Sequence, residues 1–137
     1  GGHRRKVWQN RKAVWQTPIS SNLPDIGFEI LKTQLGKCGF SAKNKTGFGI
    51  AAQMDTLHLF PRKSVQVTLD ISIKSGKAPT FFFSPDPWAN TPAFSKLLVN
   101  GNQKFVFTPS QTGSFYAVIK VQSGVKTEFS VKKFIIE

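Results

Sequence analysis

The stretch Val65–Ser75 limits the fold more than any other part of the sequence, because apolar and polar side chains alternate along its whole length. The apolar positions are Val65, Val67, Leu69, Ile71 and Ile73. A period of two places successive side chains on opposite faces of a β-strand and does not fit the 3.6-residue period of a helix. The stretch therefore predicts a long strand with one buried face and one face in water.

Further strands are predicted on both sides of this stretch. The clearest are Thr80–Ser84, Lys104–Thr108, Ser114–Gln122 and Glu128–Ile136, and the weaker candidates are Glu29–Gln34, Gly47–Gln53, Thr56–Phe60 and Phe94–Val99. Phe81-Phe82-Phe83 is a continuous apolar run, which is typical of a strand covered on both faces. Turn residues interrupt these runs about every ten residues, as in an antiparallel sandwich of eight or nine strands without helices. The lysines expected to be solvated and to protect sheet edges from pairing are Lys43, Lys45, Lys132 and Lys133.

The composition argues against a catalytic or metal site. The 137 residues suit a single domain, and they include one cysteine and two histidines. Cys38 has no partner for an intrachain disulfide and is expected to be buried, whereas His58 is expected on the exposed face of a strand. Neither a serine–histidine–acid set nor a pair of carboxylates stands at a recognisable spacing. The sequence therefore predicts a protein that is not an enzyme, has no cofactor and binds no metal. No apolar run reaches the length of about 18 residues that a membrane span needs.

The second half of the chain has an ordered series of short motifs. Asn100-Gly101 precedes Lys104-Phe105-Val106-Phe107-Thr108-Pro109, which is followed by Thr112-Gly113-Ser114-Phe115 and by the terminal strand Phe129–Glu137. This layout, from Thr56 to Glu137, resembles the galactose-binding-like jelly rolls of carbohydrate-binding modules and tailed-phage virion proteins. The resemblance implies an all-β, antiparallel jelly-roll β-sandwich over residues 22–137, and it carries no catalytic motif. Many members of that group hold a structural calcium ion, which is not expected here because the carboxylates are few and scattered.

Residues 1–21 are predicted to form a separate basic arm. Residues 1–18 contain five of the nineteen bases and none of the seven acids. Trp8 and Trp15 are seven positions apart, so on a helix they would share one face. The candidate docking residues are Arg4, Arg5, Lys6, Trp8, Arg11, Lys12 and Trp15. Such an arm can anchor on a partner protein, bind phosphates and stack on bases, or lie on a membrane surface; a solvated tail is the remaining alternative.

The longest predicted connection, Ser84–Pro92, contains three prolines and displays Trp88. Exposed loop aromatics stack on sugar rings, and Asp86 and Asn90 flank this tryptophan. With Tyr116, these residues are the candidate glycan contacts. The alternative is that Trp88 packs back onto the core or onto a neighbouring subunit.

Together with the resemblance, these features predict a non-enzymatic structural protein of a virion-type assembly, such as a phage tail, baseplate or capsid decoration. The arm would dock on neighbouring subunits and on other structural proteins of a homo-oligomeric particle, and the jelly roll would contact a glycan. One alternative is an extracellular carbohydrate-binding module that uses Trp88. A second is a small coat protein whose basic arm binds nucleic acid, with an affinity that falls steeply with salt.

Overall fold

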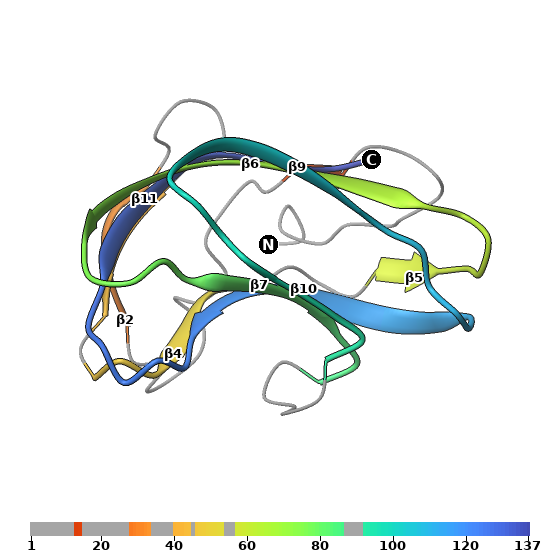
Figure 1. The fold of residues 1–137 in the computed structure, drawn as a ribbon, viewed down its shortest axis with the longest axis horizontal. Helices are drawn as coiled ribbons and strands as arrows, with labels where there is room; N and C mark the ends of the chain where they lie inside the picture. The colour runs from red at the N-terminus through yellow and green to blue at the C-terminus, as the bar shows by residue number, and fades with distance from the viewer. Residues whose placement is uncertain (1–12, 15–27, 34–39, 45, 54–56, 87–91) are drawn as a thin grey trace.

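The computed structural model describes residues 13–14, 28–33, 40–44, 46–53, 57–86 and 92–137. Within these ranges the chain forms eleven β-strands and no helix, and the strands make two antiparallel sheets. Figure 1 shows β6, β9 and β11 in one layer and β4, β7 and β10 in the other. In this part of the chain, no helix offers a long apolar stretch that could cross a membrane.

The first sheet has six strands in the order β2-β3-β11-β6-β9, and β1 also pairs with β11. Its strands are β1 (Ala13–Val14), β2 (Phe28–Thr33), β3 (Phe40–Asn44), β6 (Val65–Ser75), β9 (Gly101–Phe107) and β11 (Glu128–Ile136). The second sheet has five strands in the order β4-β10-β7-β8, with β5 also paired to β10. Its strands are β4 (Gly49–Gln53), β5 (Leu57–Leu59), β7 (Thr80–Ser84), β8 (Phe94–Leu97) and β10 (Gly113–Val121).

The chain alternates between the two sheets from β5 onward, apart from the β7–β8 hairpin within the second sheet. This connectivity confirms the predicted antiparallel jelly-roll β-sandwich. The bounds of β6, β7 and β11 are those predicted from their patterns. Among the remaining strands, β9 begins at Gly101 rather than at the predicted Lys104, and neither β1 nor β3 was predicted.

Phenylalanine rings join the two sheets. Phe81 and Phe83 on β7 are completely buried, and their ring centroids are 4.9 Å apart in an edge-to-face arrangement. Phe81 also contacts Phe134 of the first sheet at 5.9 Å, and Phe83 stacks on Phe107 of β9 at 5.1 Å. Because aromatic side chains bury large apolar areas and pack through such geometries, this cluster holds the two layers together along with the aliphatic residues of the core. The third phenylalanine of β7, Phe82, is 7% exposed and packs on the other side of the second sheet, as expected for a strand covered on both faces.

Lys132 and Lys133 lie on the central strand β11, between β3 and β6, rather than at a sheet edge. The prediction that these two lysines protect an edge was therefore wrong, as it was for Lys43 on β3, which lies between β2 and β11. Both side chains are exposed, and the pairing of β11 with β6 shifts register between Val131 and Lys133. Val131 and Phe134 both belong to the core, so two residues separate them where regular alternation allows one. The two lysines therefore occupy a β-bulge.

The β6–β7 and β10–β11 turns pack closely against each other at a glycine. They lie at the end of the sandwich opposite the β9–β10 connection. Gly76 follows β6 with a φ of 80°, and a Cβ atom there would overlap the backbone of Lys126. Thr127 Oγ1 donates a hydrogen bond of 2.9 Å to the Ser75 carbonyl in the same region. The β6–β7 and β10–β11 connections therefore pack backbone against backbone, which only glycine permits at residue 76.

Replacing Phe81 by alanine should lower the free energy of unfolding by about 3–5 kcal/mol, because the substitution leaves a cavity between the sheets. Urea denaturation measures this change. Val106→Ala is the matched control, because Val106 is 55% exposed, and it should change stability by less than about 0.5 kcal/mol. A loss below about 1 kcal/mol for Phe81→Ala would contradict the assigned core.

Candidate functional site

A cleft of about 600 Å³ opens at the end of the sandwich where β9 turns into β10. The β9–β10 turn supplies one wall, with polar side chains at Thr108, Ser110, Gln111 and Thr112. The opposite wall includes Pro85 and Ala93, which lie on either side of the connection between β7 and β8 in the sequence. The cleft thus lies between two strand connections that are distant in the sequence.

Backbone and hydroxyl contacts fix these walls. Pro109 follows β9 and has no N–H group, so it cannot continue the ladder. Next to it, the Thr108 hydroxyl is 2.7 Å from the Ser64 hydroxyl, which ties the cleft wall to the turn before β6. On the other side, the Ala93 N–H donates a hydrogen bond of 3.0 Å to the Phe83 carbonyl. Both walls are therefore anchored to strands of the sandwich.

Two phenylalanines form the apolar part of the cleft. Phe107 is 8% exposed and Phe115 is half-buried, and their rings meet edge to face at a centroid distance of 6.0 Å. A Cβ atom on Gly113 would lie 3.3 Å from the Phe115 ring, so the glycine leaves room for the ring beside the backbone. Because Phe107 also stacks on Phe83, the apolar part of the cleft is continuous with the core.

Among the described residues, the polar lining of the cleft consists of hydroxyl and amide groups, and none of the lining residues in this part of the chain has a charged side chain. The exposed polar side chains are Thr108, Ser110, Gln111, Thr112 and Ser114. Hydroxyl and amide groups both donate and accept hydrogen bonds. Aromatic surface combined with a few such groups is typical of small-molecule sites. The cleft therefore suits a neutral ligand that has an apolar face and hydroxyl groups.

The predicted glycan contacts fall in different places. Asp86 is exposed, and its carbonyl accepts a hydrogen bond of 2.7 Å from Ser84 Oγ. Tyr116 is half-buried and packs with Phe82 on the outer face of the second sheet, whereas its neighbour Phe115 packs on the core side. The cleft is lined by neither Asp86 nor Tyr116. The other two predicted contacts, Trp88 and Asn90, lie outside the described residues.

The predicted docking residues of the arm also lie outside the described residues, as do Cys38 and Lys45. Within the arm, Ala13 and Val14 are described, and they pair with Ile136 and Ile135 of the same chain.

The polar residues of the cleft wall were missed by the sequence analysis. Ser110, Gln111 and Thr112 stand between the two predicted strands Lys104–Thr108 and Ser114–Gln122. The available signal was a run of hydroxyl and amide side chains placed directly between Phe107 and Phe115. That pattern does not reveal which other connection faces the turn.

His58 faces solvent between the buried Leu57 and Leu59, as predicted. Its Nδ1 atom is 3.2 Å from Ser114 Oγ, and its ring meets the Phe60 ring edge to face at 4.9 Å. Neither described contact is a carboxylate, so the described residues assemble no serine–histidine–acid triad around it. The described part of the chain also brings together no group of three His, Cys, Asp or Glu residues suited to a metal.

A buried lysine lies on the outer face of the second sheet. Lys120 is 2% exposed, and its Nζ atom is 4.8 Å from the centroid of the Phe82 ring. Burial lowers the pKa of Lys120 because the charged ammonium loses hydration, while the negative charge of Asp86 opposes the shift. Ile50 and Val118 are buried on the same face. This face therefore differs from the cleft, since its described members form an apolar cluster around one cation.

No protein-family model matches this sequence, and no curated protein sequence matches it. Two solved structures are similar to the chain. A structure titled "BiXyn10A CBM1 APO" has 14% sequence identity and a TM-score of 0.43, with 89% of this chain and 88% of that chain covered. A mutant of a carbohydrate-binding module of family 29 has 10% identity and a TM-score of 0.48, with 91% and 89% covered. Because both sequence identities and both TM-scores are low, the two structures do not indicate what this chain binds, and its ligand is inferred from its own residues.

The lowered pKa of Lys120 makes stability depend on pH. The unfolded chain binds a proton more tightly at this lysine than the folded chain does, so stability should rise as pH rises toward the ordinary lysine value of 10.5. Urea denaturation at pH 7.5 and 10.5 should show the native chain gaining stability relative to both Lys120→Met and Lys120→Arg. Neither replacement loses a proton in this range. A difference in unfolding free energy between the native chain and the variants that is the same at both pH values would contradict the assigned burial of Lys120.

Proposed function

We propose that this chain is a non-catalytic binding protein that holds a neutral sugar ring in the cleft beside the β9–β10 turn. The observation that carries the proposal is the combination of an aromatic surface with an uncharged polar rim in one cleft. A sugar ring has an apolar C–H face and a periphery of hydroxyl groups. The Phe115 ring can pack against the first, and the side chains of Gln111 and Thr112 can hydrogen-bond to the second.

The described lining of the cleft has no charged side chain, and this limits the class of sugar that the cleft can hold. An acidic sugar would bring a carboxylate or sulfate into a cleft whose described lining residues include no cation. Desolvating an unpaired charge is costly, so a neutral ring is favoured there. Trp88 is three residues beyond Pro85 in the sequence, and for this reason its indole is included among the proposed contacts.

Affinity electrophoresis through gels that contain neutral polysaccharides, such as xylan, mannan, galactan and hydroxyethyl cellulose, tests this proposal. At least one of them should retard the native chain. Gln111→Ala should weaken that binding about 3- to 10-fold, the equivalent of one lost hydrogen bond. Trp88→Ala should weaken it by at least about tenfold, because aromatic anchors supply most of the energy of a binding contact.

Gln122→Ala is the matched control, because it removes the same amide from a second cavity at the far end of the sheet. That cavity has a volume of about 480 Å³ and is lined in part by Lys77 and Gln122. The control variant should migrate like the native chain. If Gln122→Ala abolishes the retardation and Gln111→Ala does not, the ligand binds in the second cavity, and the proposed site in the cleft is contradicted. No retardation by any of the polysaccharides would overturn the proposed function.

The structural role predicted for the arm, in a virion-type particle or on nucleic acid, stays a prediction. Its residues lie outside the described part of the chain, apart from the two that pair with β11. No contact among the described residues favours an assembly role over the binding role proposed for the cleft.

A further inference from the structure

An exposed aromatic ring lies next to the cleft but outside its described lining. Phe60 follows β5 and is 40% exposed, and its ring meets the His58 ring edge to face at a centroid distance of 4.9 Å. The Nδ1 atom of His58 is 3.2 Å from Ser114 Oγ, and Ser114 lines the cleft. These contacts therefore join the Phe60 ring to the cleft through one histidine.

The strand register places these residues on one side of the second sheet. The leucines before and after His58 are buried, whereas His58 and Phe60 are exposed, so His58 and Phe60 share the outer side. His58 is paired with Ser114 of β10, and paired residues in antiparallel strands lie on the same side of a sheet. One residue further along this register, Phe60 is level with Thr112, which also lines the cleft.

The strand order extends this surface across the end of the second sheet. The register of β4 and β5 on β10 is continuous, so both strands lie on the side of β10 opposite β7. Pro85 of the other cleft wall directly follows β7. From Pro85 to Phe60 the surface therefore crosses two strand spacings, about 10 Å. Linked sugar rings cover this width better than a single ring does.

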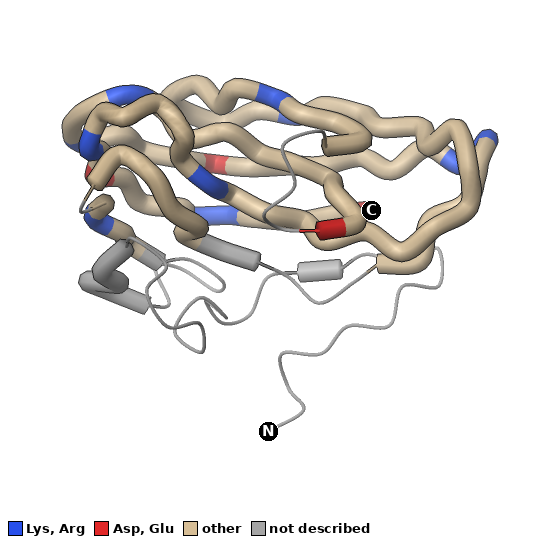
Figure 2. Tube along the Cα trace, turned by 90° about the horizontal axis from the view of Figure 1, so that it is seen from below, with Lys and Arg blue, Asp and Glu red and all other residues tan. Residues whose placement is uncertain are grey.

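Charge does not distinguish this surface from the rest of the described chain. Figure 2 shows cations and carboxylates in several parts of the described trace. Here the exposed Asp86 lies at the β7 side, and the exposed Arg62 and Lys63 come shortly after Phe60 in the sequence. An anionic chain would approach Asp86, and a cationic chain would approach Arg62 and Lys63. A neutral ligand is therefore favoured along the whole surface.

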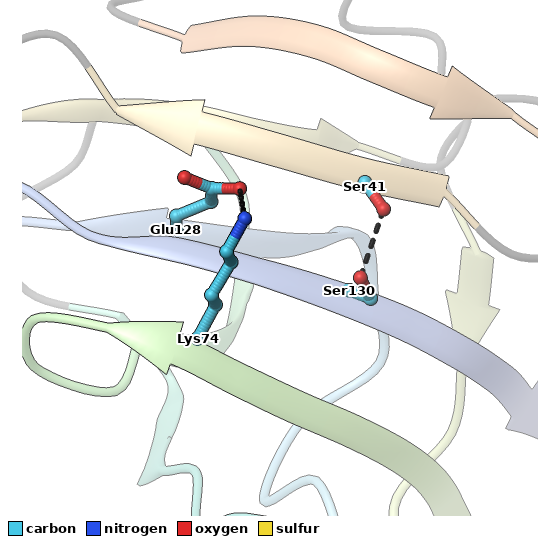
Figure 3. A network of polar contacts seen from close by, with 4 residues as sticks. All are labelled: Ser41, Lys74, Glu128 and Ser130. Atoms are coloured by element: carbon cyan, nitrogen blue, oxygen red, sulfur yellow. Dashed lines mark hydrogen bonds and ion pairs between the residues drawn. The ribbon is translucent and has the colours of Figure 1, made fainter.

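Another polar cluster on the sandwich lacks the aromatic ring. Figure 3 shows Ser41 and Ser130 of the first sheet, whose Oγ atoms are 2.8 Å apart. Beside them, Lys74 Nζ is 3.3 Å from a Glu128 oxygen. These four side chains bind one another and include no aromatic group. The surface around Phe60 instead combines a ring with hydroxyl groups, which match the C–H face and the hydroxyl groups of a sugar.

We propose that Phe60 and His58 form a second sugar subsite beside the cleft. A neutral oligosaccharide then runs from the cleft across Thr112 and Ser114 to the Phe60 ring. One sugar unit occupies the cleft, and a later unit packs its C–H face on the Phe60 ring. The exposed imidazole of His58 can hydrogen-bond to a hydroxyl group of that later unit. This inference rests on the proposed function of the cleft and adds the length of its ligand.

The test compares neutral oligosaccharides of one to six rings, taken from the polysaccharide that retards the native chain. Amide chemical shifts of the ¹⁵N-labelled full chain give a dissociation constant for each length. The native chain should bind the longer oligosaccharides at least about tenfold more tightly than a single ring, because a second linked contact adds to the first.

Phe60→Ala should weaken binding of the longer oligosaccharides about 3- to 10-fold, which is the loss expected for one aromatic contact. Its affinity for a single ring should stay within about twofold of the native value, since the cleft is unchanged. Phe48→Ala is the matched control. Phe48 is 57% exposed and lies beside Gly124, in the β10–β11 turn at the other end of the sandwich. This control should bind every length like the native chain.

The outcomes separate the second subsite from the cleft. Equal effects of Phe60→Ala and Phe48→Ala, or an affinity that does not change with ligand length, would overturn the second subsite and leave the cleft proposal in place. A Phe60→Ala loss that is the same for one ring and for six would also overturn the extended arrangement. If Gln111→Ala changes no affinity, or if no oligosaccharide shifts any amide, the proposed function of the cleft fails, and the second subsite fails with it.

A thermal melt of each variant establishes that it is folded. If Phe60→Ala does not fold, Phe60→Leu takes its place, with Phe48→Leu as its control. Leucine keeps the apolar bulk and removes the flat ring, so Phe60→Leu should weaken binding of the longer oligosaccharides about 2- to 5-fold. An unchanged affinity for these ligands would overturn the second subsite.

Discussion

The packing of phenylalanine rings between the sheets is the interaction on which the rest of the structure depends. Phe83 of β7 stacks on Phe107 of β9, and Phe107 meets Phe115 of β10 edge to face. The same rings that join the layers therefore also form the apolar part of the cleft. Phe94 is within 5.3 Å of Phe107 and belongs to β8, which follows the connection that forms the other cleft wall. The core thus sets the distance between the two connections, and a ligand there would bind a surface that the fold has already organised.

The two outer faces of the sandwich differ in chemistry. The outer face of the first sheet includes exposed lysines such as Lys104 and Lys133, whereas that of the second sheet includes a buried apolar cluster of Ile50, Phe82 and Val118, with Lys120 over Phe82. The cleft lies at one end of the sandwich and differs from both outer faces, because its described lining combines uncharged polar groups with aromatic surface. The described residues of the cleft and of the two outer faces therefore differ in charge and polarity.

The sequence predicts the strands well where one face is buried, because the core enforces the alternation. Val65–Ser75 and Glu128–Ile136 are examples. It fails at β3, where Phe40–Asn44 is short and only weakly alternating. The β-bulge at Lys132 and Lys133 can be recognised in the sequence, because two polar residues instead of one separate the apolar Val131 and Phe134. The cleft was not predictable, because it requires knowing that the turn at Ser110–Thr112 faces Pro85 and Ala93. That juxtaposition is set by long-range packing and not by any local pattern.

The most direct test of the central claim is a titration of the ¹⁵N-labelled chain with a neutral oligosaccharide taken from the best-retained polymer, followed by amide chemical shifts. Binding in the cleft predicts saturable shifts at Ser110, Gln111, Thr112 and Ser114 of one wall and at Ala93 of the other. The amides of Ser72 and Lys74 on the outer face of the first sheet should stay in place. Shifts confined to the outer face of either sheet, with the β9–β10 turn unmoved, would contradict the account.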